Sequence, residues 1–188
     1  MNDTLEKLLA GTQDILPQHA LTALVHRFMR ARSPWLKNAQ IKTVGKLAGI
    51  DFSEAKSADP ADYRTFNEFF TRELKPGARP LDPDPHALLS PCDGSISECG
   101  PLEGGRILQA KGHDYSVGAL LADDPACKAL RDGTFWTIYL SPRDYHRVHM
   151  PLAGELKRMI YVPGKLYSVA PYTVRQVPGL FAANERVV

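Results

Sequence analysis

The stretch TFWTIYLSPRDYHRVHMP, residues 134–151, indicates both how the chain folds and where its chemistry lies. Its first part, Thr134 to Leu140, is rich in aromatic and β-branched residues and predicts a buried strand. The strand is expected to end at Ser141, which can cap a helical turn, with Pro142 in the first position of the turn and Asp144 in the third. A single helical turn is therefore predicted between this strand and the residues that follow it.

Two of the six histidines, His146 and His149, lie three residues apart in this stretch. In an unbroken strand they would point to opposite faces, so they can share a site only where the backbone turns or bulges. Three interpretations stay open. A zinc site needs at least one more ligand, and this spacing is a weak metal signal, so no metal is assigned. The others are hydrogen-bonded structural histidines and acid–base catalysis, which suits a pKa near neutrality.

Residues 90–96, SPCDGSI, form the second candidate for chemistry. Asp93-Gly94 between two apolar runs is typical of a hairpin turn, and a turn aspartate is the simpler interpretation. The functional interpretation is a carboxylate held at the end of a strand to orient a histidine. The chain contains neither a Gly-x-Ser-x-Gly elbow nor a phosphate-binding glycine loop.

From Leu88 onward, short runs bounded by Gly and Pro indicate strands and turns. Residues 184–188 resemble the middle of a strand, so structure is expected to continue on residues that are not present here. The predicted fold is α+β, with N-terminal amphipathic helices followed by a mostly antiparallel β core of short strands. A helix is predicted at 117–131, and strands are predicted at 88–90, 95–97, 106–110, 134–140, 155–162 and 165–169.

Basic residues gather at the front of the chain. The whole chain carries a net charge of only +2, yet from Ile15 to Ile50 there are six Lys and Arg residues and no Asp or Glu. Residues 18–31, and again the segment after Ser33-Pro34, place apolar residues at helical spacing with the basic residues outside the apolar stripe. Two cationic amphipathic helices are therefore predicted.

These helices have two interpretations. They form either a pair lying in a membrane interface, with Arg and Lys at anionic headgroups, or a hairpin packed on the domain with a solvated basic face. The absence of acidic residues favours the membrane. Nucleic acid is disfavoured as a partner, because the basic residues alternate with an apolar stripe and do not cluster beside stacking aromatics. The residues predicted to contact the membrane are Leu21, Leu24, Phe28, Arg27, Arg30 and Trp35.

The segment from 51 to 87 connects the front end to the β-rich part. Thr65 and Glu68 form a capping box for a short helix whose apolar face is expected to dock on a core. Four prolines between residues 75 and 87 exclude regular structure and indicate a hinge. The chain is therefore predicted to divide into a helical, membrane-contacting region at 1–50, a helix with a proline-rich linker at 51–87, and an incomplete β-rich catalytic core at 88–188.

The composition limits the class of protein. The 188 residues suffice for one domain with an appendage. Three cysteines, Cys92, Cys99 and Cys127, without a Cys-x-x-Cys pair argue against a disulfide framework and favour a reducing compartment. No run approaches the roughly 20 apolar residues of a membrane span, and the first residues lack the pattern of a secretion signal. We expect a cytoplasmic protein that does not cross the membrane.

Five segments together carry a family resemblance. They are YRTFNEFF (63–70), PCDG (91–94), ILQAKGH (107–113), YLSPRDYHRVH (139–149) and FAANERV (181–187). They resemble bacterial phosphatidylserine decarboxylase, from about residue 15 to the last residue, and the run at 139–149 is highly specific to that family. The resemblance implies a lyase of phospholipid biosynthesis, made as a zymogen, that converts phosphatidylserine to phosphatidylethanolamine.

The resemblance also implies roles for individual residues. Family proenzymes cleave themselves at the Gly-Ser bond of a Leu-Gly-Ser-Thr motif, and the serine becomes a pyruvoyl group on the small subunit. The substrate amine forms a Schiff base with this group, which then accepts the electrons released with CO2. By similarity, Asp93 and His149 act with the serine in self-cleavage, and His146 serves the decarboxylation step as proton donor to the carbanion.

One departure from the family pattern is large. The chain contains no Leu-Gly-Ser-Thr, and its one Gly-Ser pair, Gly94-Ser95, is followed by Ile96. We therefore expect an N-terminal part of the large subunit, whose partner is the pyruvoyl-bearing small subunit. The expected location is peripheral, on the anionic cytoplasmic face of the bacterial inner membrane, as a homodimer of processed protomers. The alternative is a membrane-binding module without catalysis.

Overall fold

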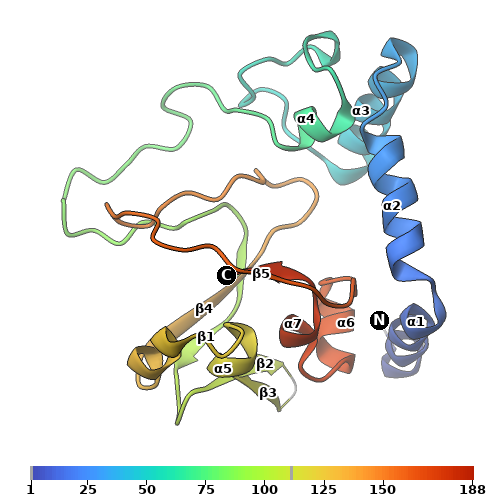
Figure 1. Ribbon diagram of the computed structural model, residues 1–188. Coiled ribbons are helices and arrows are strands. Elements are labelled where there is room, and N and C mark those ends of the chain that lie inside the picture. The colour runs from blue at the N-terminus through green and yellow to red at the C-terminus, as the bar shows by residue number, and fades with distance from the viewer. Residues whose placement is uncertain (1, 111) are drawn as a thin grey trace. The chain divides into compact units, whose positions relative to one another are not determined.

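The computed structural model describes residues 2–110 and 112–188, and its elements confirm the predicted α+β fold (Figure 1). The helices are α1 (Asp3–Ile15), α2 (Gln18–Met29), α3 (Pro34–Ala48), η1 (Pro60–Asp62), α4 (Phe66–Phe70), α5 (Val117–Leu120), η2 (Pro125–Leu130), α6 (Pro171–Gln176) and α7 (Leu180–Ala183). The strands are β1 (Ser95–Pro101), β2 (Arg106–Ala110), β3 (His113–Ser116), β4 (Thr134–Tyr139), β5 (Tyr161–Val162) and β6 (Arg186–Val187).

The chain forms two compact units, each discontinuous in sequence. Unit 1 combines the residues up to Ala23 with Ile96–Thr137 and Leu156–Val188, and unit 2 combines Leu24–Ser95 with Ile138–Glu155. One boundary between the units falls inside α2. The division of the chain at residues 50 and 87 stays a prediction.

The core of unit 2 forms between α3 and α4. Ile41 on α3 is fully buried, and Phe66 and Phe69 on α4 are buried with it. The Phe69 ring lies 5.1 Å from Phe52 and 5.4 Å from Tyr63, between ring centroids. Such aromatic contacts contribute packing energy beyond the apolar area that they bury. The second predicted basic helix therefore uses its apolar face within the protein.

The capping box at α4 is confirmed in a modified form. The Thr65 hydroxyl accepts a hydrogen bond from the Glu68 amide at 3.1 Å, as predicted. The Glu68 carboxylate in turn accepts from the backbone N–H of Arg64 at 2.6 Å, one residue before the cap. The helix start is thus fixed from both sides, which positions Phe66 and Phe69 for the core.

Unit 1 contains short strands over a second core. β2 and β3 pair antiparallel, with a register shift between Leu108 and Ala110, and β5 pairs antiparallel with β6. β1 pairs with β4. The buried residues of this core are Leu102, Ile107, Tyr115 and Val117.

The predicted strands are confirmed at β1, β2 and β4 but are wrong elsewhere. Residues 88–90 form no strand, 155–162 contributes only β5, and 165–169 contributes only a bridge from Lys165 to Asn184. β4 is not buried as predicted, because Trp136 on it is exposed. The predicted helix at 117–131 is split, because positive φ at Ala122 and Asp123 ends α5 before η2 begins.

The sequence interpretation missed four elements of unit 1: α1, β3, α6 and α7. α1 is capped by the Asn2 side chain, which accepts from the Thr4 amide. It packs on α6, and its buried Glu6 pairs with Arg175. The pairing of α1 with α6 joins segments about 170 residues apart, so no local pattern in the sequence could reveal it.

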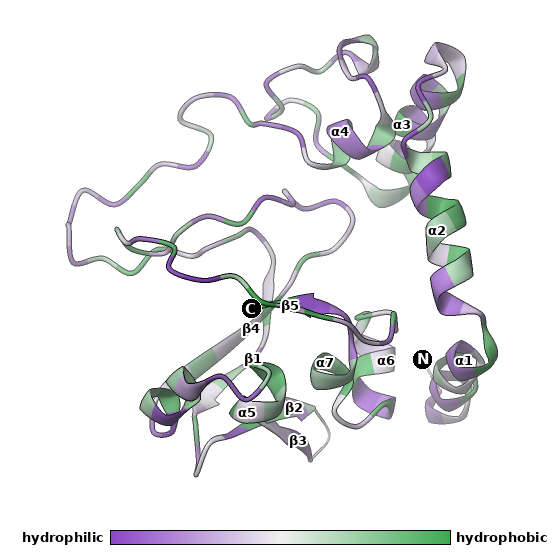
Figure 2. Cartoon of the chain, in the orientation of Figure 1, coloured by the Kyte–Doolittle hydropathy of each residue, from purple (hydrophilic) through white to green (hydrophobic). Residues whose placement is uncertain are grey.

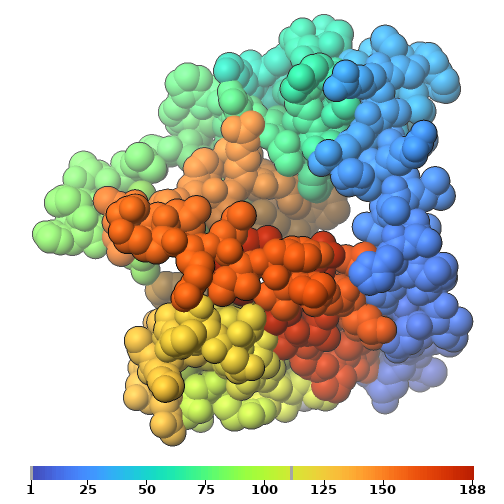
Figure 3. Space-filling model, in the orientation of Figure 1, coloured from blue at the N-terminus to red at the C-terminus, as the bar shows by residue number. Residues whose placement is uncertain are grey.

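α2 differs from the other long helices in that none of its residues is buried. It carries hydrophobic and hydrophilic residues along its length (Figure 2), and its side chains reach the surface on the face drawn in Figure 3. Within residues 2–110 and 112–188, no helix has the length and apolar character that crossing a membrane requires.

Candidate functional site

The two predicted catalytic histidines lie just after a turn that ends β4. The Asp144 amide donates to the Ser141 carbonyl at 2.9 Å, which closes the turn. The Asp144 carboxylate accepts from the Ser141 amide at 2.6 Å and from its hydroxyl at 2.8 Å. The turn is therefore present at the predicted residues, and the side chain of its third residue fixes it. All of these residues belong to unit 2.

His146 is half-buried against this turn. Its Nε2 lies 2.9 Å from the Ser141 carbonyl oxygen. Because a carbonyl only accepts, Nε2 carries a proton, and in the neutral ring Nδ1 is left as the basic nitrogen. The ring stacks on Phe70 of α4, with centroids 4.1 Å apart. The histidine is thus held in one orientation and one tautomer, with one nitrogen available for proton transfer.

His149 has different surroundings and is exposed. Its Nε2 forms a hydrogen bond with the hydroxyl of buried Tyr145 at 3.0 Å, and the two rings stack. Its backbone N–H donates to the Pro91 carbonyl at 2.7 Å. That bond ties the histidine segment to the segment that carries Asp93, two residues after Pro91.

Asp93 pairs with an arginine. Arg79 Nε donates to Asp93 Oδ1 at 2.9 Å and Nη2 donates to Oδ2 at 2.6 Å, while its remaining N–H groups reach Glu54 at 2.8 and 3.0 Å. The Arg79 hydrogen bonds lower the pKa of Asp93, against the opposite effect of burial, and the charge of His149 adds to the lowering. The carboxylate is therefore ionised at neutral pH.

The charge of His149 contributes a little to the lowered pKa of Asp93, whereas His146 forms a hydrogen bond with the Ser141 carbonyl and stacks on Phe70. Within the described residues, the Asp93 carboxylate accepts its side-chain hydrogen bonds from Arg79. The orientation of a histidine by Asp93 stays a prediction.

The predicted hairpin at Asp93-Gly94 is wrong. These residues lead into β1, whose partner is the distant β4. Gly94 has φ 138°, and a Cβ built on it would lie 2.5 Å from the Tyr139 carbonyl oxygen. A glycine is required here because the backbone of the β4 end passes against it. That close approach fixes Asp93 beside the segment that carries the histidines.

A polar pocket of about 160 Å³ adjoins Asp93 in unit 2. Its lining includes Arg72, which is only 4% exposed and lies over the Phe69 ring at 5.3 Å. Burial lowers the pKa of Arg72, and its Nε and Nη1 have no hydrogen-bond partner in the described chain. Sequence reasoning missed Arg72 and Arg79, since neither stands in a motif. Their presence near the Asp93 carboxylate is decided by tertiary packing.

The residues predicted to contact a membrane fall on exposed surface. Leu24 and Trp35 are 66% and 75% exposed, and Phe28, Arg27 and Arg30 are also exposed. Leu21, one turn before Leu24 on the same helix, is exposed too. Among residues 2–110 and 112–188, no group of three or more His, Cys, Asp or Glu side chains is arranged to hold a metal ion.

Comparisons with known proteins give a consistent result. A family model described as phosphatidylserine decarboxylase matches residues 66–188, and a second, described as PSD, matches residues 8–48. The chain is 55% identical to the phosphatidylserine decarboxylase proenzyme of Alkalilimnicola ehrlichii over 184 residues, which is 97% of this chain and 64% of that protein. The proenzymes of Pseudomonas fluorescens and Xanthomonas campestris are 53% and 52% identical, over 97% and 96% of this chain and 64% of each relative.

Proposed function

Because the chain belongs to the phosphatidylserine decarboxylase family, we propose that it forms the large-subunit part of an enzyme that converts phosphatidylserine to phosphatidylethanolamine. The chain spans about 64% of the length of the curated relatives. The observation that carries the proposal is the identity of 55% over nearly the whole chain, together with the match of the family model to residues 66–188, the range in which the turn and both histidines lie. The relatives are named as proenzymes, which supports the further proposal of self-cleavage and of a small partner subunit.

The prosthetic group that we propose is a pyruvoyl group, and it has to come from a serine elsewhere. The one Gly-Ser pair of these 188 residues is Gly94-Ser95. This pair lies at the start of β1, where Gly94 packs against the Tyr139 carbonyl. We therefore assign it a role in the fold and not in self-cleavage. When bound at the site, the pyruvoyl group supplies an electron sink for loss of CO2.

We propose that the residues of this chain act in the reaction by transferring protons. Loss of CO2 breaks the bond between the carboxylate and Cα and leaves the electron pair at Cα, which must then take up a proton. His146 is proposed as the donor: because its Nε2–H is held by the Ser141 carbonyl, its Nδ1 would take up a proton from solvent and pass that proton to Cα. His149 is proposed to take the proton of the serine hydroxyl during self-cleavage, with ionised Asp93 stabilising the imidazolium that forms.

We also propose that the enzyme is peripheral on the anionic cytoplasmic face of the inner membrane. The exposed apolar residues Leu24 and Phe28, with Arg27 and Arg30 beside them, support this location. A homodimer of processed protomers is proposed from the family resemblance, and the mass of the processed protein in solution tests it.

The roles are tested in the complete protein with three histidine variants. His149→Ala should block self-cleavage, measured by the appearance of the small subunit. His146→Ala should spare more of the cleavage but slow formation of phosphatidylethanolamine by about 10²–10⁴-fold, the usual effect of losing a general acid. His86→Ala, in the exposed proline-rich segment, is the control and should do neither. Normal processing and turnover in both test variants would refute the assignment of roles.

A further inference from the structure

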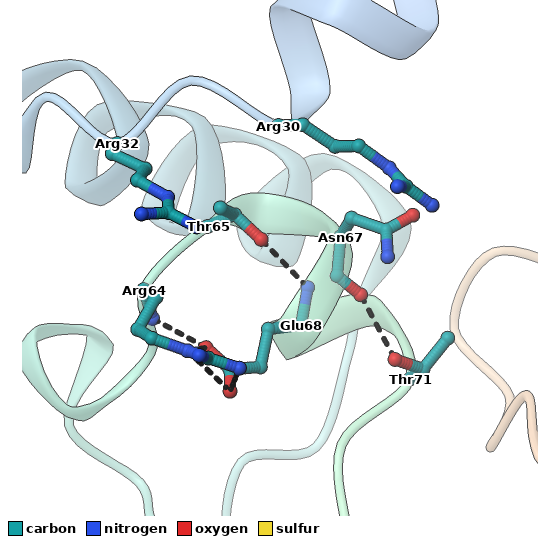
Figure 4. Close-up of a pocket in the computed structure, with 7 residues that line it drawn as sticks. All are labelled: Arg30, Arg32, Arg64, Thr65, Asn67, Glu68 and Thr71. Carbon is teal, nitrogen blue, oxygen red and sulfur yellow. Dashed lines mark hydrogen bonds and ion pairs between the residues drawn. The ribbon is translucent and has the colours of Figure 1, made fainter.

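A second pocket, of about 360 Å³, lies in unit 2 between the residues that follow α2 and the start of α4 (Figure 4). Nothing in the proposed proton-transfer chemistry uses it. Pockets of this size are in the range that holds a small ligand or a headgroup. Its lining residues are Arg30, Arg32, Arg64, Thr65, Asn67, Glu68 and Thr71.

The pocket carries an excess of positive charge. Three arginines and one glutamate line it. Arg64 is already neutralised, because its Nε and Nη2 lie 3.2 and 3.1 Å from Glu68 Oε1. In the described part of the chain, the guanidinium groups of Arg30 and Arg32 have no hydrogen bond or ion pair. Two free cationic forks therefore remain for an anion, and a guanidinium fork suits the oxygens of a phosphate.

The uncharged polar side chains of the pocket fall into two groups. Some form hydrogen bonds that hold the pocket wall in place, and one is available to a ligand. The Thr65 hydroxyl caps α4, and the Thr71 hydroxyl donates to the Asn67 carbonyl at 3.0 Å. These bonds hold the wall of the pocket in place. The side-chain amide of Asn67 forms no such bond in the structure as described, and Figure 4 shows its oxygen turned toward the guanidinium of Arg30 and its nitrogen turned away. An amide N–H₂ is a neutral donor that can complete the coordination of an anionic oxygen.

The immediate neighbours of the pocket in the sequence are apolar and exposed. Phe28 lies two residues before Arg30, and Trp35, which is 75% exposed, lies three residues after Arg32. A tryptophan or phenylalanine beside basic residues suits the depth at which lipid phosphates lie. No aromatic residue lines the pocket itself, so it lacks a platform on which a nucleic-acid base could stack.

We propose that this pocket binds the phosphate of a phospholipid headgroup in the bilayer, through Arg30 and Arg32 with Asn67 as a third donor. The inference rests on the proposed membrane association and is independent of decarboxylation. It adds a site of defined geometry to what would otherwise be diffuse attraction between a basic helix and an anionic surface. The site would fix the depth and rotation of the α2 end relative to the lipid phosphates.

The test compares arginines inside and outside the pocket in the complete protein. Binding is measured by co-sedimentation with vesicles of phosphatidylcholine containing phosphatidylglycerol, and by calorimetric titration with monomeric dihexanoyl-phosphatidylglycerol. Arg30→Gln and Arg32→Gln should each weaken vesicle binding about tenfold or more, as loss of a charge-assisted bond implies. Arg27→Gln, which removes an exposed charge outside the pocket, should weaken it by about fivefold at most. The short-chain lipid should bind the wild type and Arg27→Gln but not the double variant.

Three other outcomes would contradict the proposed phospholipid site. Equal losses in all three single variants would show diffuse attraction. Inorganic phosphate binding as tightly as the short-chain lipid would show a site for the free anion, and a single-stranded oligonucleotide binding more tightly would show a nucleic-acid site. Thermal unfolding confirms that the variants fold. Turnover of phosphatidylserine in detergent micelles separates the pocket proposal from the decarboxylase proposal. The pocket variants should turn over micellar phosphatidylserine as the wild type does. A wild type that fails to do so would refute the decarboxylase proposal and leave the pocket proposal standing.

Discussion

Helices α2 and α3 have the same sequence pattern but differ in how far their apolar residues are buried. Both place apolar residues at helical spacing with Lys and Arg outside the stripe, and neither contains an acid. On α3, Ile41 is fully buried against the aromatic residues of α4, whereas on α2 no residue is buried. Periodicity therefore predicts that a helix has an apolar face, but the chain that follows decides what covers it. The packed-hairpin interpretation applies to α3, and the membrane interpretation stays a proposal for α2.

The same contrast holds for the basic residues. Lys37 on α3 is buried, and its Nζ donates to the Pro60 carbonyl and to the Asn38 side chain, both at 2.7 Å. It is therefore not part of a solvated or membrane-facing basic surface, although the sequence pattern placed it there. Arg27 and Arg30 on the α2 side are exposed. Of the basic residues that the pattern groups together, only some are available to an anionic partner.

The largest expected difference between the helices is in stability. Ile41→Ala should lower the free energy of unfolding by about 2–5 kcal/mol, because it leaves a cavity in the core of unit 2. Leu24→Ala, the matched change on α2, should lower it by about 0.5 kcal/mol or less, since that side chain is exposed. Urea unfolding of the complete protein measures both. Similar losses in the two variants would mean that α2 is packed as α3 is.

A smaller difference in the free energy of unfolding is expected when Lys37 on α3 and Arg27 on α2 are replaced. Lys37→Met should cost about 1–3 kcal/mol, because it removes three hydrogen bonds made by a buried charged donor, to the Asn38 side chain and to the Pro60 and Ala61 carbonyls. Arg27→Met should leave the free energy of unfolding within about 0.5 kcal/mol of the wild type. Thermal unfolding of each variant decides the matter. If Lys37→Met were as stable as Arg27→Met, the buried bonds of Lys37 would contribute nothing.

The smallest expected effect depends on pH and concerns Arg79. Its partners Asp93 and Glu54 both have lowered pKa values in the folded chain. A lowered carboxyl pKa contributes stability at a pH above the unfolded value, near 4, which is lost as the pH falls through the folded value. Arg79→Gln should therefore cost at most about 1 kcal/mol at pH 6, since the groups are partly exposed, and the cost should begin to fall near pH 4 and vanish once the pH is below the lowered folded pKa values.

The matched control for this titration is Arg27→Gln. Because Arg27 has no carboxylate partner in the described chain, its removal should leave the dependence of unfolding on pH unchanged. A cost of Arg79→Gln that persisted unchanged down to pH 3 would show that the ion pairs with Asp93 and Glu54 are not its source.

Local features of the fold were predictable from the sequence, and long-range ones were not. The cap at Thr65, the turn at Ser141 and the helix starting at Pro34 depend on residues within a few positions of one another, and each is present. β4 is only partly buried where a buried strand was expected, because its apolar residues do not reveal how many layers cover them. The split of the helix at 117–131 depends on the positive φ of Ala122 and Asp123. Aspartate tolerates this conformation, but alanine gives no signal of it.

The candidate site divides in the same way. His146, His149 and Asp93 could be selected by residue type and by family resemblance. The partners that define their states could not, because Arg79 reaches Asp93 over 14 residues and Glu54 over 25, from a segment without regular structure. Phe70, which orients His146, was predicted only as part of an apolar helix face.

The bond between Arg79 and Asp93 has a consequence for the order of events on the ribosome. Glu54 and Arg79 are synthesised before Asp93, and His149 follows Asp93 by 56 residues. At the usual rates of synthesis this interval lasts roughly 3 to 11 s. Asp93 could therefore pair with Arg79 before His149 is synthesised. In the proenzyme that we propose, this order would keep the carboxylate paired with an arginine during translation, and Asp93 would meet its proposed partner in self-cleavage, His149, only when the later segment is made.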